Sequence, residues 1–400
     1  MAELRPRDGG GSRPPMWTVW SLERAEKVDR MHRRVTDEGF RGLSGAPAPD
    51  TPAPPPAPPA DGSEPARHAL LAFLDSLPVR QVATVRFPME HESRRHWMNG
   101  SRFYGRHGQC LEDLDHSRRA LALSVVAASL GTEGYRQLVD VMRLNRTIGE
   151  LRDELDVLNE WLYWFSVYGS PDRPGAPWGW QLDGHHLAVN CVVVDGRMTL
   201  TPSFLGAEPV VAEGGRYAGT RVFGPEEAAG AALFSALSEE QRARARIAEV
   251  MPPDLFTGAY RDNLHLERAG LCLADMSRAQ RESAYDLIDL YVDRAPRDQA
   301  AVRRADVRAH GALTSFAFVG DGGPGGAFYY RVHSPVVLIE FEHMASVMFE
   351  VDEPWRNHVH TVVRTPNGGD YGVDLLRRHH ASHHDGSGPG TRGGPPGAAG

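Results

Sequence analysis

The sequence contains few cysteines and a single lysine. The three cysteines, Cys110, Cys191 and Cys272, stand far apart in a chain of 400 residues and form no Cys-x-x-Cys pair. This spacing argues against a structural zinc site built on cysteine and against a disulfide framework. Lys27 is the only lysine among 44 basic residues, so arginine carries nearly all of the positive charge. We attribute this bias to the codon usage of a GC-rich bacterial genome and give it no functional weight.

Long apolar runs and an excess of positive charge are also missing. Mean hydropathy is -0.40, and the sequence lacks the run of about 18 apolar residues that a membrane-spanning helix needs. The first residues, MAELRPRDGGGSRPPMW, do not have the charged-then-apolar pattern of a signal peptide. A net charge of -8 leaves no overall basic field for nucleic acid. We therefore expect a cytoplasmic protein that binds neither membranes nor nucleic acid.

Segments of low complexity flank a central region. Residues 1–66 include the tract APAPDTPAPPPAPPADGSEPA, which favours extended conformations, and a short amphipathic helix is expected before it near Ser21–Glu38. Residues 381–400 are rich in glycine and proline. We expect both ends to be disordered extensions and residues 67–380 to fold as a single domain.

Within the central region, helical and strand patterns follow one another. DLDHSRRALALSVVAASLG and the segment after it have helical apolar spacing, and two later segments begin with the Ser-x-x-Gln of a capping box at Ser238 and Ser277. HHLAVNCVVVDGRMTLTPSFLG predicts a hairpin that turns at Asp195-Gly196. LTSFAFVGDGGPGGAFYYRVHSPVVLIEFEH predicts an antiparallel meander, to which HVHTVVRT adds a strand. The predicted class is α+β, with a helical N-terminal half packed on a mostly antiparallel β-sheet.

Two adjacent histidines lie at the end of the predicted hairpin that is far from its turn. Because side chains alternate along a strand, His185 is expected on the core side and His186 on the polar side. A hydrogen-bonded core histidine and a solvent-facing histidine are the ordinary alternatives. Trp178 and Trp180 lie just upstream, an arrangement typical of a pocket wall, although aromatic residues more often belong to the core.

The last predicted strand carries a second pair of histidines. His358 and His360 share a face with Arg364, and two histidines at i, i+2 can both reach one metal ion, although many such pairs are incidental. Glu340 on the neighbouring strand would supply the carboxylate of a two-histidine, one-carboxylate site. Two glutamates facing solvent at positions 340 and 342 are an equally good interpretation of the same pattern.

The residues after these histidines suit a substrate better than a metal ion. Arg364 is a good clamp for an anionic substrate. Asn367 lies in a predicted Pro-Asn-Gly turn. Asp370 precedes a helix expected at 373–380, where it can also be a simple helix cap.

Three stretches in order resemble one known family. PWGWQLDGHHLAVNCVVVDGRMTLTPSFLGAEP, FYYRVHSPVVLIEFEH and NHVHTVVRTPNGGDYGVDLL are similar to the bacterial and fungal family called domain of unknown function 3500. The resemblance extends over most of residues 66–380. It implies a concentration of His, Glu, Arg and Asn at strand ends that is compatible with a catalytic or metal-binding cleft, and it implies no particular substrate.

The preferred hypothesis is a metal-dependent enzyme. A divalent iron, copper or zinc ion would be held by His358, His360 and one of His185, His186 or Glu340. The candidate catalytic residues, acting on a small anionic or carbonyl-bearing molecule, are His185, His186, Arg364, Asn367 and Asp370. The all-imidazole character and the aromatic residues favour an oxidoreductase slightly over a hydrolase.

Two alternatives stay open. The first is a metal-free acid/base enzyme in which Glu340 or Asp183 tunes the pKa of a histidine and Arg364 binds the substrate charge. The second is a ligand-binding or interaction protein without catalysis, whose proline-rich arm docks a partner.

Overall fold

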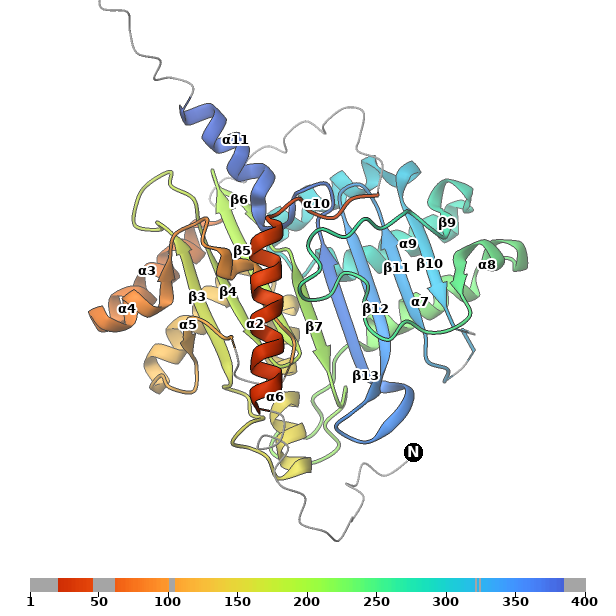
Figure 1. Ribbon diagram of the computed structural model, residues 1–400. Coiled ribbons are helices and arrows are strands. Elements are labelled where there is room, and N and C mark those ends of the chain that lie inside the picture. Colours follow the sequence, from red (N-terminus) through yellow and green to blue (C-terminus); the bar gives the residue numbers. More distant parts are fainter. Residues whose placement is uncertain (1–20, 46–61, 101–104, 321, 324, 385–400) are drawn as a thin grey trace, which may run out of the picture.

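The computed structural model describes residues 21–45, 62–100, 105–320, 322, 323 and 325–384. In these residues the chain forms ten α-helices and a 13-stranded mixed sheet (Figure 1). The predicted α+β class is confirmed, since helices fill the N-terminal region and most strands follow them. The proline-rich tract over 46–61 and the tail from residue 385, both predicted to be disordered, lie outside the described residues.

Most helices pack on one face of the sheet, which we call the helix face. Buried residues of α3, α5, α6, α7, α9 and α10 form one continuous apolar core with alternate residues of the strands. The predicted capping boxes at Ser238 and Ser277 are both present, and they begin α8 and α9. These helices are α3 (Glu64–Ser76), α4 (Val79–Val85), α5 (His116–Ser129), α6 (Thr132–Arg152), α7 (Gly224–Ser235), α8 (Glu239–Ala245), α9 (Arg278–Val292) and α10 (Arg297–Ala309).

The sheet has the order β1-β3-β4-β5-β7-β13-β12-β11-β10-β8, with β2, β6 and β9 paired at its sides. Neighbours are antiparallel except for the parallel pairs β1–β3 and β8–β10. The strands are β1 (Arg86–Phe87), β2 (Gln109–Cys110), β3 (Tyr163–Gly169), β4 (Trp178–Gly184), β5 (Leu187–Val194), β6 (Arg197–Thr199), β7 (Ser203–Ala207), β8 (Arg246–Ala248), β9 (Leu271–Cys272), β10 (Ser315–Val319), β11 (Tyr329–His333), β12 (Leu338–Ser346) and β13 (Val351–Arg364).

The predicted hairpin and meander are both present. β5 and β6 turn at Asp195 and Gly196, which both have the positive φ of a type I′ turn. The meander is β10–β11–β12, and the predicted additional strand is β13. β13 pairs with β12 on one side and with β7 on the other, so it joins the two halves of the sheet. This pairing brings residues 203–207 beside residues 359–363.

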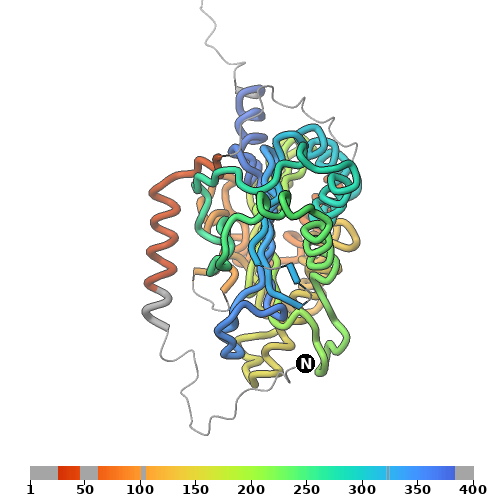
Figure 2. Tube along the Cα trace, turned by 90° about the vertical axis from the view of Figure 1, so that its right-hand side faces the viewer, coloured from red at the N-terminus to blue at the C-terminus, as the bar shows by residue number. Residues whose placement is uncertain are grey.

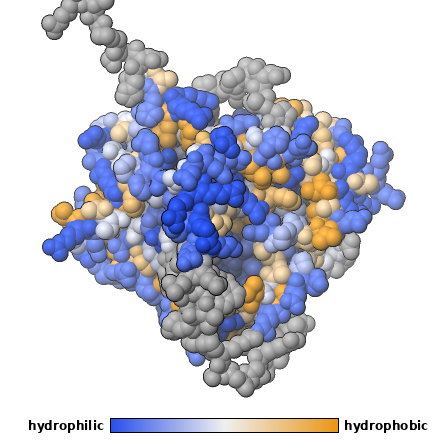
Figure 3. All heavy atoms as spheres, in the orientation of Figure 1, coloured by the Kyte–Doolittle hydropathy of each residue, from blue (hydrophilic) through white to orange (hydrophobic). Residues whose placement is uncertain are grey.

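The other face of the sheet carries the predicted polar positions, and we call it the histidine face. It is also buried, because irregular segments around Trp97 and Leu255 pack there against Phe204 and Val362. Helix α2 (Ser21–Glu38), which the sequence predicts, lies on this side, opposite α7–α10 (Figure 2). Its surface in front of the sheet is hydrophilic (Figure 3).

Residues 21–45 are part of the fold, although the sequence prediction placed them in a disordered extension. Val35 and Leu43 are buried, and Ser44 pairs with His265 in an isolated bridge. The final helix, α11 (Val373–His384), begins at the predicted residue and extends past His380. Among the described helices, we find none with both the length and the apolar character that crossing a membrane requires.

Candidate metal centre

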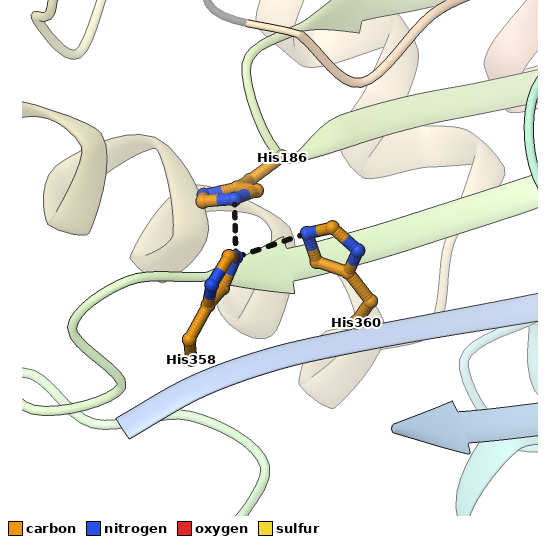
Figure 4. Close-up of side chains that lie close together, drawn as sticks. All are labelled: His186, His358 and His360. Atoms are coloured by element: carbon orange, nitrogen blue, oxygen red, sulfur yellow. Dashed lines mark hydrogen bonds between the residues drawn. The ribbon is translucent and has the colours of Figure 1, made fainter. Parts of the chain in front are cut away.

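Three histidine rings from distant parts of the chain meet on the histidine face. The Nε2 atom of His358 lies 3.2 Å from Nε2 of His186 and 3.1 Å from Nε2 of His360 (Figure 4). All three side chains are buried, and one ligand atom from each lies within 4.8 Å of the others. Nitrogen atoms this close can share one cation, so this group, the histidine triad, can hold a metal ion.

The position of His186 follows from a tight turn and from strand register. Gly184 pairs with Leu187, so His185 and His186 are the two turn residues between β4 and β5, and His186 has a φ of 59°. The carbonyl of His186 accepts a hydrogen bond from the Gly206 amide at 2.7 Å. Gly206 in turn is the β7 partner of His360. Because Gly206 contacts both, the pairing of β7 with β13 places the β4–β5 turn beside the two histidines of β13.

Gly206 makes room for two of the rings. A Cβ atom at this position would lie 2.8 Å from Cδ2 of His360 and 3.3 Å from Cδ2 of His186. Carbon atoms that are not bonded to each other do not approach within 3 Å, so any side chain here would push the rings apart. The absence of a side chain at residue 206 is thus a geometric requirement of the triad.

The hydrogen bonds of His358 fix which of its nitrogens can bind a cation. Its Nδ1 lies 2.8 Å from the carbonyl oxygen of Ala345. A carbonyl only accepts, so Nδ1 donates its hydrogen and Nε2 keeps a free lone pair in the neutral ring. This is the arrangement in which metal-binding histidines are held by an outer partner.

Two histidines of the triad, His186 and His358, are kept uncharged by their surroundings. Burial lowers the pKa of His186 well below its ordinary value, and the neighbouring rings of His185, His358 and His360 lower it further. Burial and His360 likewise hold the pKa of His358 well below its usual range. Neutral imidazole is the form that binds metal ions, so these two ligands are ready near neutral pH without first losing a proton.

Three acidic side chains lie around the triad and are not among its ligands. Asp254 Oδ1 lies 3.7 Å from Nδ1 of His360, and Glu208 Oε2 lies 3.8 Å from Nδ1 of His358. Glu342 is opposite His360 in the strand register, and neither of its oxygens has a hydrogen-bond partner among the described residues. Burial, reinforced by Asp254 and Glu340, raises the pKa of Glu342 to about 9. Glu342 is therefore protonated at neutral pH without metal, and a cation at the triad would favour its ionised form.

Two other predicted ligands lie outside the triad. Glu340 is buried on the histidine face, where it accepts hydrogen bonds from Tyr329 and from the backbone amides of Phe256 and Thr257. His185 is held by Asn145 Oδ1 at 2.7 Å from its Nδ1. The expectation that the adjacent histidines point in opposite directions is wrong. Both lie in a turn and not in an extended strand, and their rings stack with centroids 3.9 Å apart.

Arg364 and Asp370 lie together at the end of β13, beyond the histidines. Arg364 is fully buried and donates to Asp370 at 2.8 Å, to Asp262 at 2.9 Å and to the carbonyl of Thr257 at 2.7 Å. Asp370 also accepts from the amide of Thr365. Two carboxylates therefore already balance the charge of this buried guanidinium.

Asn367 and the two tryptophans lie elsewhere. Asn367 donates its side-chain amide to the carbonyl of Pro335 at 2.9 Å and has a φ of 58°. Trp178 and Trp180 belong to the core on the helix face, where Trp180 donates to Ser129. The ordinary alternative for these aromatics, that they are core residues, is therefore the correct one.

Two residues of the centre were missed from the sequence. A glycine inside a strand pattern often marks a close approach, so Gly206 carried a usable signal. Asp254 follows two prolines in an irregular segment, and no local pattern relates it to His360.

Comparison with known proteins gives one match. A family model with the description "Protein of unknown function (DUF3500)" matches residues 60–373. Neither the curated proteins nor the solved structures contain a match to the chain.

Proposed function

This chain belongs to the DUF3500 family, and we propose that it is a metal-dependent enzyme acting on a small molecule at the histidine triad. The observation that carries the proposal is the convergence of three buried Nε2 atoms from the β4–β5 turn and from β13. Three protein ligands leave a further coordination position open, as catalytic metal sites require and structural sites do not.

The proposed ion is divalent zinc, iron or copper. Imidazole suits all three ions, so the ligand set does not separate them. Such an ion supplies Lewis acidity toward a carbonyl or a bound water, and iron or copper adds redox chemistry. Both reaction classes, oxidoreductase and hydrolase, belong to the proposal. Trp178 and Trp180 lie on the helix face, away from the triad. The aromatic residues therefore no longer favour an oxidoreductase over a hydrolase.

Residues around the triad would orient the ligands of the ion and compensate part of its positive charge. Hydrogen bonding to Ala345 keeps the His358 ring oriented, whereas Asp254 lies at ion-pair distance, 3.7 Å, from His360 Nδ1 and would act on that ring through its charge. Burial raises the pKa of Glu208 to about 7 and that of Glu342 to about 9, so the bound ion would first favour their ionised forms, which would then offset part of its charge. These partners act through the ligands, so we assign them positioning and electrostatic roles.

Access to the centre limits the substrate to a small molecule. The exposed fractions of the three histidines are only 4% to 7%. The side chain of Asp254, which lies 3.7 Å from His360, is 45% exposed. Since the charge of Arg364 is already balanced by Asp262 and Asp370, we favour a neutral carbonyl-bearing substrate over an anionic one.

Metal content tests the proposal directly. The protein is purified without a tag and without residues 381–400, and His379 and His380 are replaced by alanine, so that no cluster of tail histidines is left to bind metal. It is then incubated with zinc, cobalt, iron or copper, desalted, and analysed by elemental mass spectrometry. We expect about one ion per chain, as in other three-histidine sites with one open position. The cobalt form should show the intense visible absorption of a four- or five-coordinate ion.

Matched variants place the ion. His186→Ala, His358→Ala and His360→Ala should each remove most of the bound metal while the circular dichroism spectrum is retained. His333→Phe, which changes a buried histidine outside the triad, should keep it. Metal that follows the tail, or a chain that binds none, would leave the acid/base enzyme or the binding protein as the better hypothesis.

A further inference from the structure

A second potential binding site lies on the helix face, behind the sheet from the triad. It is a cavity of about 470 Å³ between the sheet and the helices α6, α9 and α10. Small-molecule sites typically measure roughly 300–1,000 Å³, so the cavity has the right size for one ligand. Its apolar walls include Leu138, Val189, Leu205, Val302 and Val363.

The polar part of the cavity has an excess of positive charge. Four arginines line it, Arg197, Arg294, Arg303 and Arg378, against the two aspartates Asp306 and Asp374. Each aspartate has a basic neighbour: Asp306 lies 3.6 Å from His310, and Asp374 lies 3.8 Å from Arg378, which is one of the four arginines.

Two of the arginines have unused hydrogen-bonding capacity. Arg303 donates to Thr365 Oγ1 at 2.7 Å and has no carboxylate within ion-pair distance among the described residues. Burial lowers its pKa, and the carboxylates of Asp306, Asp370 and Asp374, all beyond ion-pair distance, offset this effect only in part. Arg294 is 8% exposed and pairs with Glu226 through Nη2, whereas its Nε and Nη1 have no described partner. A buried guanidinium without a counter-ion is costly, so this cavity favours an anion.

We propose that the cavity binds a small amphipathic carboxylate, with its apolar body between Val189 and Val302 and its carboxylate on Arg303. The planar guanidinium matches a carboxylate in two parallel hydrogen bonds. This site is separate from the histidine triad, because Leu205 faces the cavity while its neighbours Phe204 and Gly206 face the histidines. The proposal therefore does not depend on metal binding.

Three ten-carbon probes test the proposal on the full-length protein. Decanoate, decanol and decylammonium share one apolar chain and differ in head-group charge. Binding is measured by calorimetry below the micelle concentration of each probe. We expect decanoate to bind at least about tenfold more tightly than decanol, which corresponds to about 1.4 kcal/mol, and decylammonium to bind more weakly than either.

Variants on α10 assign the head-group contact. Arg303→Gln should weaken decanoate binding about tenfold and leave decanol binding unchanged. Arg304→Gln is the matched control, because Arg304 lies next to Arg303 on the same helix, pairs with Asp293 and does not line the cavity. Val302→Trp should block both probes by filling the apolar part. Circular dichroism and melting temperature check that each variant folds.

Three results would overturn the proposal. The first is equal affinity of wild-type protein for decanoate and decanol, a comparison that needs no variant. The second is an equal loss of decanoate affinity in Arg303→Gln and Arg304→Gln. The third is undiminished decanoate binding by folded Val302→Trp. Metal content measured on the same samples should be unchanged in all three variants, whichever way the probe experiment turns out.

Discussion

At the scale of single residues, the triad depends on the missing side chain of Gly206. Gly206→Ala would place a methyl group 2.8 Å from the His360 ring and also 2.8 Å from the carbonyl of Val359. The backbone cannot move without disturbing β7 and β13, so the rings must separate. We expect metal affinity to fall by about 10–100-fold, the range seen when groups that orient metal ligands are removed. Titration with a competing chelator measures this change.

Gly224→Ala is the control for that prediction. Gly224 begins α7, has an ordinary φ, and a Cβ there would meet nothing within 4 Å. Metal affinity should be unaffected in this variant. If Gly206→Ala binds metal as tightly as Gly224→Ala, the ion does not sit among the three rings.

A buried histidine away from the triad predicts a pH dependence of stability. Burial, with Arg331 and Arg268, lowers the pKa of His333 from 6.5 to about 4. Between these values the unfolded chain takes up a proton that the folded chain excludes, so stability falls as the pH drops below 6.5. His333→Phe removes this loss. Relative to wild type, the variant should gain about 1.4 kcal/mol of unfolding free energy per pH unit from pH 6 to pH 5.

Urea unfolding at pH 7, 6 and 5 measures the effect. Any cost of the substitution that does not depend on pH cancels in the comparison. His68→Phe, at a side chain that is 70% exposed, is the control for the same change of residue type outside the core. Parallel pH curves for wild type and His333→Phe would contradict the prediction.

Local patterns identified some site residues and not others. His358 and His360 stand two residues apart in one strand, so their common face was predictable from the sequence. The choice between His185 and His186 was not, because it depends on a turn whose positive φ at residue 186 breaks the alternation of a strand. Glu342 was correctly placed on the face of Glu340, but its burial depends on the segment around Leu255 packing over the sheet.

At the scale of elements, a buried ion-pair network fastens the end of β13. Arg364 joins Asp370, which follows the strand, to Asp262 in the irregular segment that covers the histidine face. Removing one partner leaves a buried charge partly uncompensated. We expect Asp370→Asn to lower the free energy of unfolding by about 3 kcal/mol, as measured by urea denaturation at pH 7.

The comparison for this network is Asp374→Asn. Asp374 pairs with Arg378 at 3.8 Å, on a helix where the arginine is 56% exposed, so its loss should cost less than about 1 kcal/mol. If Asp370→Asn retains full stability yet loses activity, a direct role of Asp370 toward the substrate gains support.

Elements with strong local signals were predicted well. The capping boxes at Ser238 and Ser277, the Asp195-Gly196 turn and the amphipathic helix at 21–38 all rest on contacts within a few residues. Whether that helix joins the fold was not predictable. Its docking depends on residues such as His96 and Tyr260, which contact His32 and lie far away in the sequence.

At the scale of the whole molecule, the order of the strands could not be predicted from the sequence. Each strand pattern fixes its own faces, but nothing local states that β13 inserts between β7 and β12. That insertion is what brings residue 186 to residues 358 and 360. The α+β class was predictable from the succession of patterns, whereas the shared location of the histidines needed the tertiary structure.

The same insertion predicts that metal should stabilise the entire fold. An ion bound to His186 and to β13 links the β4–β5 turn to the strand at the centre of the sheet. A ligand present at about 100 times its dissociation constant adds about 2.7 kcal/mol to the stability of the folded state. We expect a higher melting temperature with metal, reversal by a chelator, and no response in His358→Ala. An equal response in that variant would place the ion elsewhere.

Strand β7 limits which insertions and deletions this chain can tolerate in evolution. Its odd and even positions serve different sites, since Ser203 and Leu205 face the cavity while Phe204 and Gly206 face the histidines. Inserting or deleting one residue would exchange the two sets and spoil both sites in a single event. The exposed loop at 213–216 is not part of a strand, so its length does not set which residues face either site. Length variation among natural homologues should therefore gather in that loop and spare β7.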